Sequence, residues 1–223
     1  MTHRHVALAA IASITLAACG GSDGPPRLSP ASSGTLANCT SLTGFSFNNT
    51  TITAATVVAA GTLTNAGQPV GEHCRVTGRM NQRTSTVDGL TYAIGFEMRL
   101  PKDWSGRFLY QGNGGTDGVV STADGGNSIG SGGLLRNGLQ LGFAIISSDA
   151  GHTAAQNPLF GLDPQARLDY GYQAVGTLTP MAKALVRAAY GRDADRSYIA
   201  GTSNGGRHAM VAAARFADQY DGY

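Results

Sequence analysis

Large apolar side chains occupy every second position from Tyr92 to Leu100, with smaller or polar residues between them. A period of two is typical of a strand with one buried face, so we predict a half-buried β-strand there. Further strands are predicted at runs that are apolar or rich in Thr and Val and end at glycine or polar residues. These runs are residues 56–64, 75–80, 107–111 and 142–147, with a turn over 101–106. The run at 142–147 is apolar on both faces, as in a buried strand of a parallel sheet.

The longest helical pattern covers residues 165–190. Asp163 and Pro164 form a suitable N-cap and first-turn pair before it, and Gly191 is a suitable stop. Pro180 lies inside this stretch and lacks an amide hydrogen, so we expect it to kink or divide the helix. A short apolar run at 198–200, a glycine-rich turn and an Ala-rich helical segment at 208–217 follow. Antiparallel strands followed by strand, helix, strand, turn and helix predict an α/β fold with a mixed sheet and flanking helices.

The turn before the last helix contains Gly-x-Ser-x-Gly, centred on Ser203. The pattern occurs twice more, at 20–24 in a polar segment and at 126–130 in a Gly/Ser loop with no helix behind it. Only Ser203 has a strand before it and a helix after it. This is the arrangement of a nucleophile elbow in an α/β hydrolase, which exposes a serine hydroxyl above the end of the sheet. Ser203 is therefore the candidate catalytic residue; the alternative is an ordinary glycine-rich strand-to-helix turn.

The amino-terminal residues have the pattern of an export signal. Arg4 precedes a short apolar run at 6–18, and Leu16-Ala17-Ala18-Cys19 resembles a bacterial lipobox. We predict a lipoprotein-type signal peptide over 1–18, lipidation of Cys19 and a flexible tether over 19–36. A plain secretory signal with an incidental cysteine is the alternative. On either interpretation the protein is exported, either lipid-anchored at the cell envelope or secreted, and contacts a membrane only through the lipid.

Export determines how the cysteines are interpreted. If Cys19 carries the lipid, Cys39 and Cys74 remain in an oxidising compartment, and we predict a disulfide between them. Closing this loop would stabilise the fold by about 3 kcal/mol. So few cysteines at this spacing build no metal site.

The composition fits one globular domain, which we place at residues 37–223. The chain is 42% hydrophobic, 13% charged and carries a formal net charge of +2. Such weak charge, without a run of Lys and Arg, argues against a nucleic-acid partner.

The chain offers no evident general base for Ser203. In hydrolases with this elbow the acid and then the histidine follow the serine. The last histidine, His208, lies five residues after Ser203 on the same predicted helix, from which it cannot easily swing back over the elbow. We expect His208 to be a surface or packing residue. We also expect the chain to be truncated after the elbow helix, without the triad Asp and His.

Six motifs, in order, resemble the tannase/feruloyl esterase family, and the likeness covers residues 39–223. They are Cys74-Arg75-Val76-Thr77-Gly78, Phe96-x-Met98-Arg99-Leu100-Pro101, Trp104-x-Gly106-Arg107-Phe108, Gln111-Gly112-Asn113-Gly114-Gly115, Ser148-Asp149-Ala150-Gly151-His152 and Gly201-Thr202-Ser203-Asn204-Gly205-Gly206-Arg207. The resemblance implies hydrolysis of small esters of aromatic acids, of feruloyl or galloyl type, through a serine acyl-enzyme. It also implies that a lid, which often carries calcium in this family, lies outside this amino-terminal portion, so no cofactor is expected in this chain.

The resemblance also implies roles for single residues. Ser203 matches the nucleophile, and the backbone amide of Asn204 matches one oxyanion donor. Gly114 and Gly115 match the other donor, whose loss typically costs roughly 3 kcal/mol; a plain strand-exit turn is the alternative for this loop. His152 matches a family histidine outside the triad, which we expect to be structural or to line the pocket.

One position departs from the family. Thr202 stands where the family usually has a cysteine that is disulfide-linked beside the catalytic histidine, so that link cannot form. A second function therefore stays open, a non-catalytic exported binding lipoprotein that retains the hydrolase fold. The elbow and the glycine loop favour the enzyme, whereas Thr202 and the missing base favour the binding protein.

Overall fold

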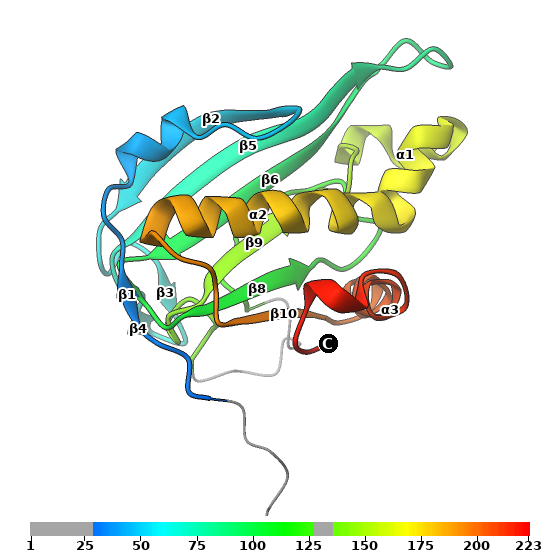
Figure 1. The fold of residues 1–223 in the computed structure, drawn as a ribbon. Coiled ribbons are helices and arrows are strands. Elements are labelled where there is room, and N and C mark those ends of the chain that lie inside the picture. Colours follow the sequence, from blue (N-terminus) through cyan, green and yellow to red (C-terminus); the bar gives the residue numbers. More distant parts are fainter. Residues whose placement is uncertain (1–28, 127–135) are drawn as a thin grey trace, which may run out of the picture. The chain divides into compact units, whose positions relative to one another are not determined.

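A six-stranded mixed sheet, in the order β10-β8-β9-β6-β5-β2, forms the centre of the fold (Figure 1). The computed structural model describes residues 29–126 and 136–223. The predicted signal peptide, Cys19 and most of the predicted tether lie outside the described residues. Residues Ala31–Tyr223 form one compact unit. Its sheet strands are β2 (Thr50–Val58), β5 (His73–Thr84), β6 (Thr91–Pro101), β8 (Arg107–Gly112), β9 (Ala144–Ser148) and β10 (Arg196–Gly201).

The strand directions divide the sheet into two parts. β8 runs parallel to both β9 and β10, while the pairs β2–β5, β5–β6 and β6–β9 are antiparallel. The predicted mixed α/β sheet is confirmed. The parallel part matters for function, because the carboxyl ends of β8, β9 and β10 meet at one edge.

Most predicted strands are present, but one is displaced. The alternating stretch from Tyr92 to Leu100 lies in β6, and its large apolar side chains are buried. The strand predicted at 56–64 is wrong, since β2 ends at Val58 and the chain turns at Gly61, where φ is 80°. β2 is half exposed and consists mainly of Thr and Ala, so its apolar pattern is weak.

Four two-residue strands complete the β structure: β1 (Gly34–Thr35), β3 (Thr64–Asn65), β4 (Gln68–Pro69) and β7 (Asp103–Trp104). β1 pairs antiparallel with β7, which lies inside the predicted turn at 101–106. The end of the segment predicted to be a flexible tether is therefore ordered. The Gly34 backbone lies so close to the indole of Trp104 that a Cβ there would be 3.2 Å from the ring.

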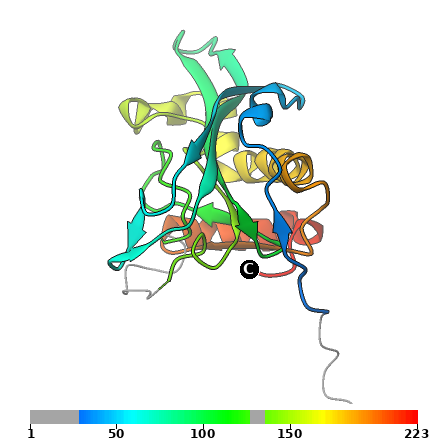
Figure 2. The ribbon, with the colours of Figure 1, turned by 90° about the vertical axis from the view of Figure 1, so that its left-hand side faces the viewer.

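The predicted helix at 165–190 consists of three pieces. α1 (Pro164–Leu168) leads into one π turn (Asp169–Gln173) and then α2 (Ala174–Tyr190), which lies along one face of the sheet (Figures 1 and 2). Asp163 caps α1 through the Ala166 amide at 2.7 Å, as expected from the sequence. Pro180 does not divide α2. Its ring is exposed while neighbouring Leu178 and Met181 are fully buried, so packing on the sheet outweighs the lost hydrogen bond.

α3 (Asn204–Arg215) begins directly after Ser203, four residues before the predicted start. Short 3₁₀ turns fill the remaining connections: η1 (Thr40–Gly44), η2 (Ala154–Gln156), η3 (Leu159–Leu162) and η5 (Ala217–Gln219). Among the helices in the described part of the chain, none has the length and apolar character required to cross a bilayer.

The predicted disulfide is present. Cys39 and Cys74 are bridged with their Cα atoms 5.4 Å apart. The bridge ties the segment before η1 to the start of β5, where Cys74 is fully buried between β2 and β6.

Candidate active site

Ser203 occupies the sharp turn between β10 and α3. Its backbone has φ 58° and ψ −123°, and the residue is exposed to solvent. Residues other than glycine rarely adopt this backbone conformation, which costs of order 1–3 kcal/mol and recurs at functional sites. The strand, the strained serine and the helix together have the geometry of a nucleophile elbow.

Three glycines allow the strand ends and the helix to approach closely enough to form this turn. A Cβ on Gly201 would lie 2.4 Å from the carbonyl carbon of Gly205. A Cβ on Gly205 would lie 2.3 Å from the carbonyl oxygen of Gly112. Real Cβ atoms do not come this close to backbone, so the spacing of glycine in the motif follows from packing.

The loop after β8 reaches the same edge of the sheet as the elbow. Gly112 and Gly201 are register partners at the ends of parallel β8 and β10. Gly114 and Gly115 follow on the surface, and Gly115 has φ 65°. Asn113 holds the start of this loop against β9, because its buried amide donates to Ser147 Oγ at 2.9 Å and to the Ser148 carbonyl at 2.8 Å.

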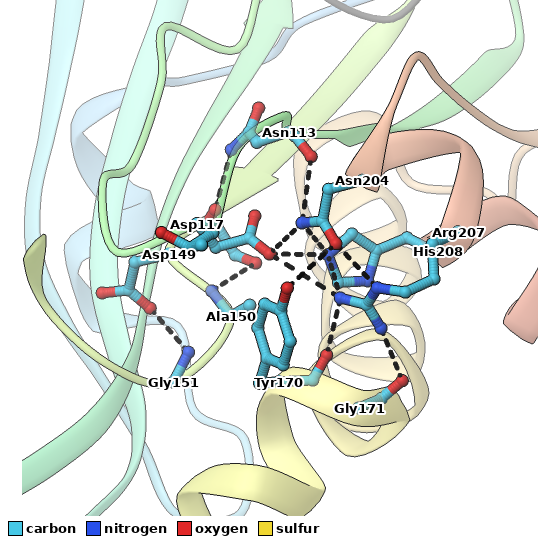
Figure 3. A network of polar contacts seen from close by, with 12 residues as sticks. Asn113, Asp117, Asp149, Ala150, Gly151, Tyr170, Gly171, Asn204, Arg207 and His208 are labelled. Atoms are coloured by element: carbon cyan, nitrogen blue, oxygen red, sulfur yellow. Dashed lines mark hydrogen bonds and ion pairs between the residues drawn. The ribbon is translucent and has the colours of Figure 1, made fainter. Parts of the chain in front are cut away.

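Asp117, at the end of this loop, contacts the elbow helix (Figure 3). Its side chain is only 1% exposed. Asn204 Nδ2 donates to Asp117 Oδ2 at 2.6 Å, and His208 Nε2 lies 2.8 Å from the same oxygen. Arg207 Nη2 is 3.9 Å from it. A buried carboxylate is stable only with such partners, so Asp117 binds the loop to the first two turns of α3.

Arg207 extends these contacts to the π turn. It donates to Asn204 Oδ1 at 2.6 Å and to the Tyr170 and Gly171 carbonyls at 3.0 Å each. Its guanidinium also lies over the Tyr170 ring, 4.3 Å from the centroid. The arginine of the elbow motif therefore ties the first turn of α3 to the π turn.

His208 is not on the surface. It is 3% exposed, points toward Asp117, and has a Tyr170 ring 6.4 Å away at its edge. Of the two environments expected for it from the sequence, surface or packing, the structure gives the interior one, within a polar network. Asp117 was not among the residues predicted from the sequence, although polar residues at 204, 207 and 208 on one side of an Ala-rich helix indicated a polar partner.

A second histidine, His152, supports the glycine loop from behind. It is buried, stacks on Phe160 at 3.8 Å, and its Nε2 lies 3.0 Å from the Thr116 carbonyl and 3.1 Å from Asn157 Oδ1. Burial lowers the pKa of its imidazole. A neutral ring that donates to Thr116 is therefore the favoured state.

Asp149 lies at the carboxyl end of β9, next to the same loop. Its Oδ1 accepts from the Gly95 and Gly151 amides, each at 2.9 Å. Burial raises the pKa of this carboxyl to about 7, although the two amides oppose the shift. A cavity of about 620 Å³ over β5 and β6 has Asp149 and Phe96 in its lining, but not Ser203, so we do not assign it to the elbow.

The histidines in the described part of the chain have partners other than Ser203. His73 contacts the Gly71 carbonyl and Arg99, and His152 and His208 are engaged as described above. In residues 29–126 and 136–223 there is also no group of three or more His, Cys, Asp or Glu side chains that could hold a metal ion.

Comparison with known proteins gives consistent matches. The family description "Tannase and feruloyl esterase" matches residues 74–223, more than half of the chain. The mono(2-hydroxyethyl) terephthalate hydrolase of Piscinibacter sakaiensis is 44% identical over 171 residues, which is 73% of this chain and 28% of that protein. Feruloyl esterase B from Aspergillus oryzae superposes with a TM-score of 0.65 at 28% identity, covering 82% of this chain and 35% of that one. Another esterase from Aspergillus oryzae gives a TM-score of 0.67 at 25% identity, covering 82% and 36%. The chain thus spans about a third or less of the length of each relative.

Proposed function

The chain belongs to the tannase and feruloyl esterase family, and we propose that the intact protein is a serine carboxylic-ester hydrolase acting on small esters of aromatic acids, of feruloyl or galloyl type. The observation that carries the proposal is the strained backbone of Ser203, φ 58° and ψ −123°, at the junction of β10 and α3. Strained residues of this kind cluster at active sites, where the strain is part of the mechanism.

In this proposal Ser203 Oγ attacks the ester carbonyl and forms an acyl-enzyme, which water then hydrolyses. The Asn204 amide, at the first turn of α3, and an amide of Gly114 or Gly115 stabilise the oxyanion. The register of Gly112 with Gly201 supports this assignment, because it brings the glycine loop and the elbow to one edge of the sheet. The backbone amide of Asn204 is well placed to stabilise a negatively charged intermediate, because the N-terminus of a helix carries the positive end of the backbone dipole.

The general base is the part of the mechanism that the described residues do not supply. We propose that the triad Asp and His come from sequence that the longer relatives have and this chain does not, and that the 223 residues alone hydrolyse esters poorly. We propose that the lid, which often carries calcium in this family, also comes from that further sequence.

Export is also proposed. The Cys39–Cys74 disulfide supports an oxidising compartment. Lipidation of Cys19, after cleavage of residues 1–18, would anchor the protein at the cell envelope. No nucleic-acid partner is proposed, and the aromatic ester is the expected small-molecule partner.

One observation favours the second candidate, a non-catalytic binding lipoprotein. Thr202 precedes the serine, so the family's link between nucleophile and catalytic histidine cannot form. A binding protein with this fold would keep the elbow only as a packing element.

The experiment compares the 223-residue chain with a form extended to the length of the relatives, using methyl ferulate and methyl gallate. We expect hydrolysis by the extended form, loss in its Ser203→Ala variant, and little hydrolysis by the short form. Binding of either ester without Ser203-dependent turnover in the extended form would favour the binding protein.

A further inference from the structure

We propose that Asp117 is a positioning residue that fixes the Gly114–Gly115 loop against the nucleophile elbow through Asn204 and His208. This inference rests on the proposed function, because it concerns the loop assigned to the oxyanion. Asp117 does not touch the reacting atoms; it sets the distance between two elements that do.

The loop is attached on two sides, and only one of them reaches the elbow. On the β9 side, the Asn113 side chain binds Ser148, His152 Nε2 contacts the Thr116 carbonyl, and the Gly118 amide donates to the Asp149 carbonyl at 3.1 Å. On the elbow side, the polar contacts found in the described residues pass through α3 side chains. Apart from a long bond from Asn204 Nδ2 to the Asn113 carbonyl at 3.5 Å, they end on the Asp117 carboxylate.

The attachment also holds one residue of the loop, Asp117, in an uncommon backbone conformation. Gly115, Asp117 and Gly118 all have positive φ, at 65°, 57° and 87°. For Asp117, a non-glycine residue, this conformation is uncommon. Two hydrogen bonds from α3 to one buried oxygen hold Asp117 in this conformation. They thereby also fix the position of Gly114 and Gly115, which precede it.

The two hydrogen-bond partners of Asp117 approach the same carboxylate oxygen from one face of α3. Asn204 and His208 are four residues apart on α3, so their side chains lie on one face. Both reach Oδ2 rather than sharing the two carboxylate oxygens. An uncharged amide at position 117 can therefore accept both bonds, which separates hydrogen bonding from charge. A glutamine at 208 can likewise replace the Nε2 donor.

Catalysis depends on how closely the oxyanion donors are aligned with the reacting carbonyl group. Displacing a catalytic group by about 1 Å can lower a rate by roughly 10²-fold. A loop freed from the elbow loses this alignment in the transition state, while the contacts that bind ground-state substrate remain. The rate constant kcat should therefore fall, with KM nearly unchanged.

The test uses the intact, extended protein and the variants Asp117→Ala, Asp117→Asn, His208→Leu and His208→Gln. We expect kcat to fall about 10- to 100-fold in Asp117→Ala and in His208→Leu, with KM within about twofold, and to recover largely in Asp117→Asn and His208→Gln. Asp163→Ala is the matched control. It removes a carboxylate of comparable burial, 4% exposed against 1%, that pairs with Arg83 and lies outside this network. It should lower the unfolding temperature and leave kcat unchanged.

Hydrogen exchange of the loop amides, residues 114–118, separates this inference from the proposed function. If the extended wild type shows no Ser203-dependent turnover, the proposed function fails, yet faster exchange in Asp117→Ala alone would still support the attachment. Unchanged exchange in Asp117→Ala, wild-type kcat in that variant, or equal losses of kcat in Asp117→Asn and Asp117→Ala would each overturn the inference.

Discussion

The carbonyl oxygen of Gly112 lies only 2.3 Å from the position that a Cβ on Gly205 would occupy. The first turn of α3 therefore rests directly on the end of β8, backbone against backbone. This contact joins the elbow to the strand that carries the proposed oxyanion loop, and it accounts for the second glycine of the Gly-x-Ser-x-Gly motif. The other close contact, between Gly201 and Gly205, accounts for the first.

Gly205→Ala should destabilise the fold. The added methyl has no space because the nearest atoms are backbone, and overpacking typically costs about 1–3 kcal/mol. Gly206→Ala is the matched control in the same helix, since its Cβ would meet only the Gly201 carbonyl at 3.4 Å. Replacing a helical glycine by alanine without a clash should stabilise by up to about 1 kcal/mol. Urea unfolding measures both, and a Gly205→Ala protein as stable as the wild type would contradict the packing described here.

Removing the disulfide should lower the free energy of unfolding by about 3 kcal/mol, because the bridge restrains a chain segment in the unfolded state. The two cysteines are 35 residues apart. The double variant Cys39→Ala/Cys74→Ala and the reduced wild type are compared by thermal or urea unfolding. A reductant should destabilise the wild type and have no effect on the double variant. Equal sensitivity of both proteins would show that the effect of the reductant lies elsewhere.

Asp149 should make stability depend on pH in the neutral range. Burial raises the pKa of its carboxyl to about 7. Between about pH 4 and about pH 7 the folded protein then holds a proton that the unfolded chain releases, so stability falls as the pH rises. Asp149→Asn keeps the acceptor for Gly95 and Gly151, since both amides donate to one oxygen. The variant should gain stability over the wild type as the pH rises through this range. A constant difference in urea unfolding across the range would contradict this.

The elbow was predictable from the sequence because its causes are local. Gly201, Ser203 and Gly205 lie within five residues, and the strand and helix on either side have their own patterns. The alternation through β6 was equally clear because, from Tyr92 to Glu97, the side chains on one face of that strand are buried and those on the other are only partly buried. By contrast, the start of β2 was missed because an edge strand of Thr and Ala buries too little apolar surface to show a pattern.

The contact of Asp117 with Asn204 was not predictable in the same way. The two residues are 87 positions apart, and Asp117-Gly118 after a glycine-rich run is typical of an ordinary turn. Only the sheet topology, which puts β8 beside β10, brings the loop to the helix. The effect of Pro180 was not predictable either, because it depends on how the opposite face of α2 packs against the sheet.

The last prediction concerns the strain at Ser203. Its φ of 58° and ψ of −123° match the first central position of a type II′ turn, which glycine adopts without strain. Ser203→Gly should therefore be more stable than Ser203→Ala by about 1 kcal/mol, the strain of roughly 1–3 kcal/mol less the greater flexibility of glycine in the unfolded chain. Both variants lack the hydroxyl, so their difference in urea unfolding isolates the backbone from the lost side chain. Neither should hydrolyse esters. If Ser203→Ala equals or exceeds Ser203→Gly in stability, the elbow is not strained, and the main argument for Ser203 as a nucleophile is lost.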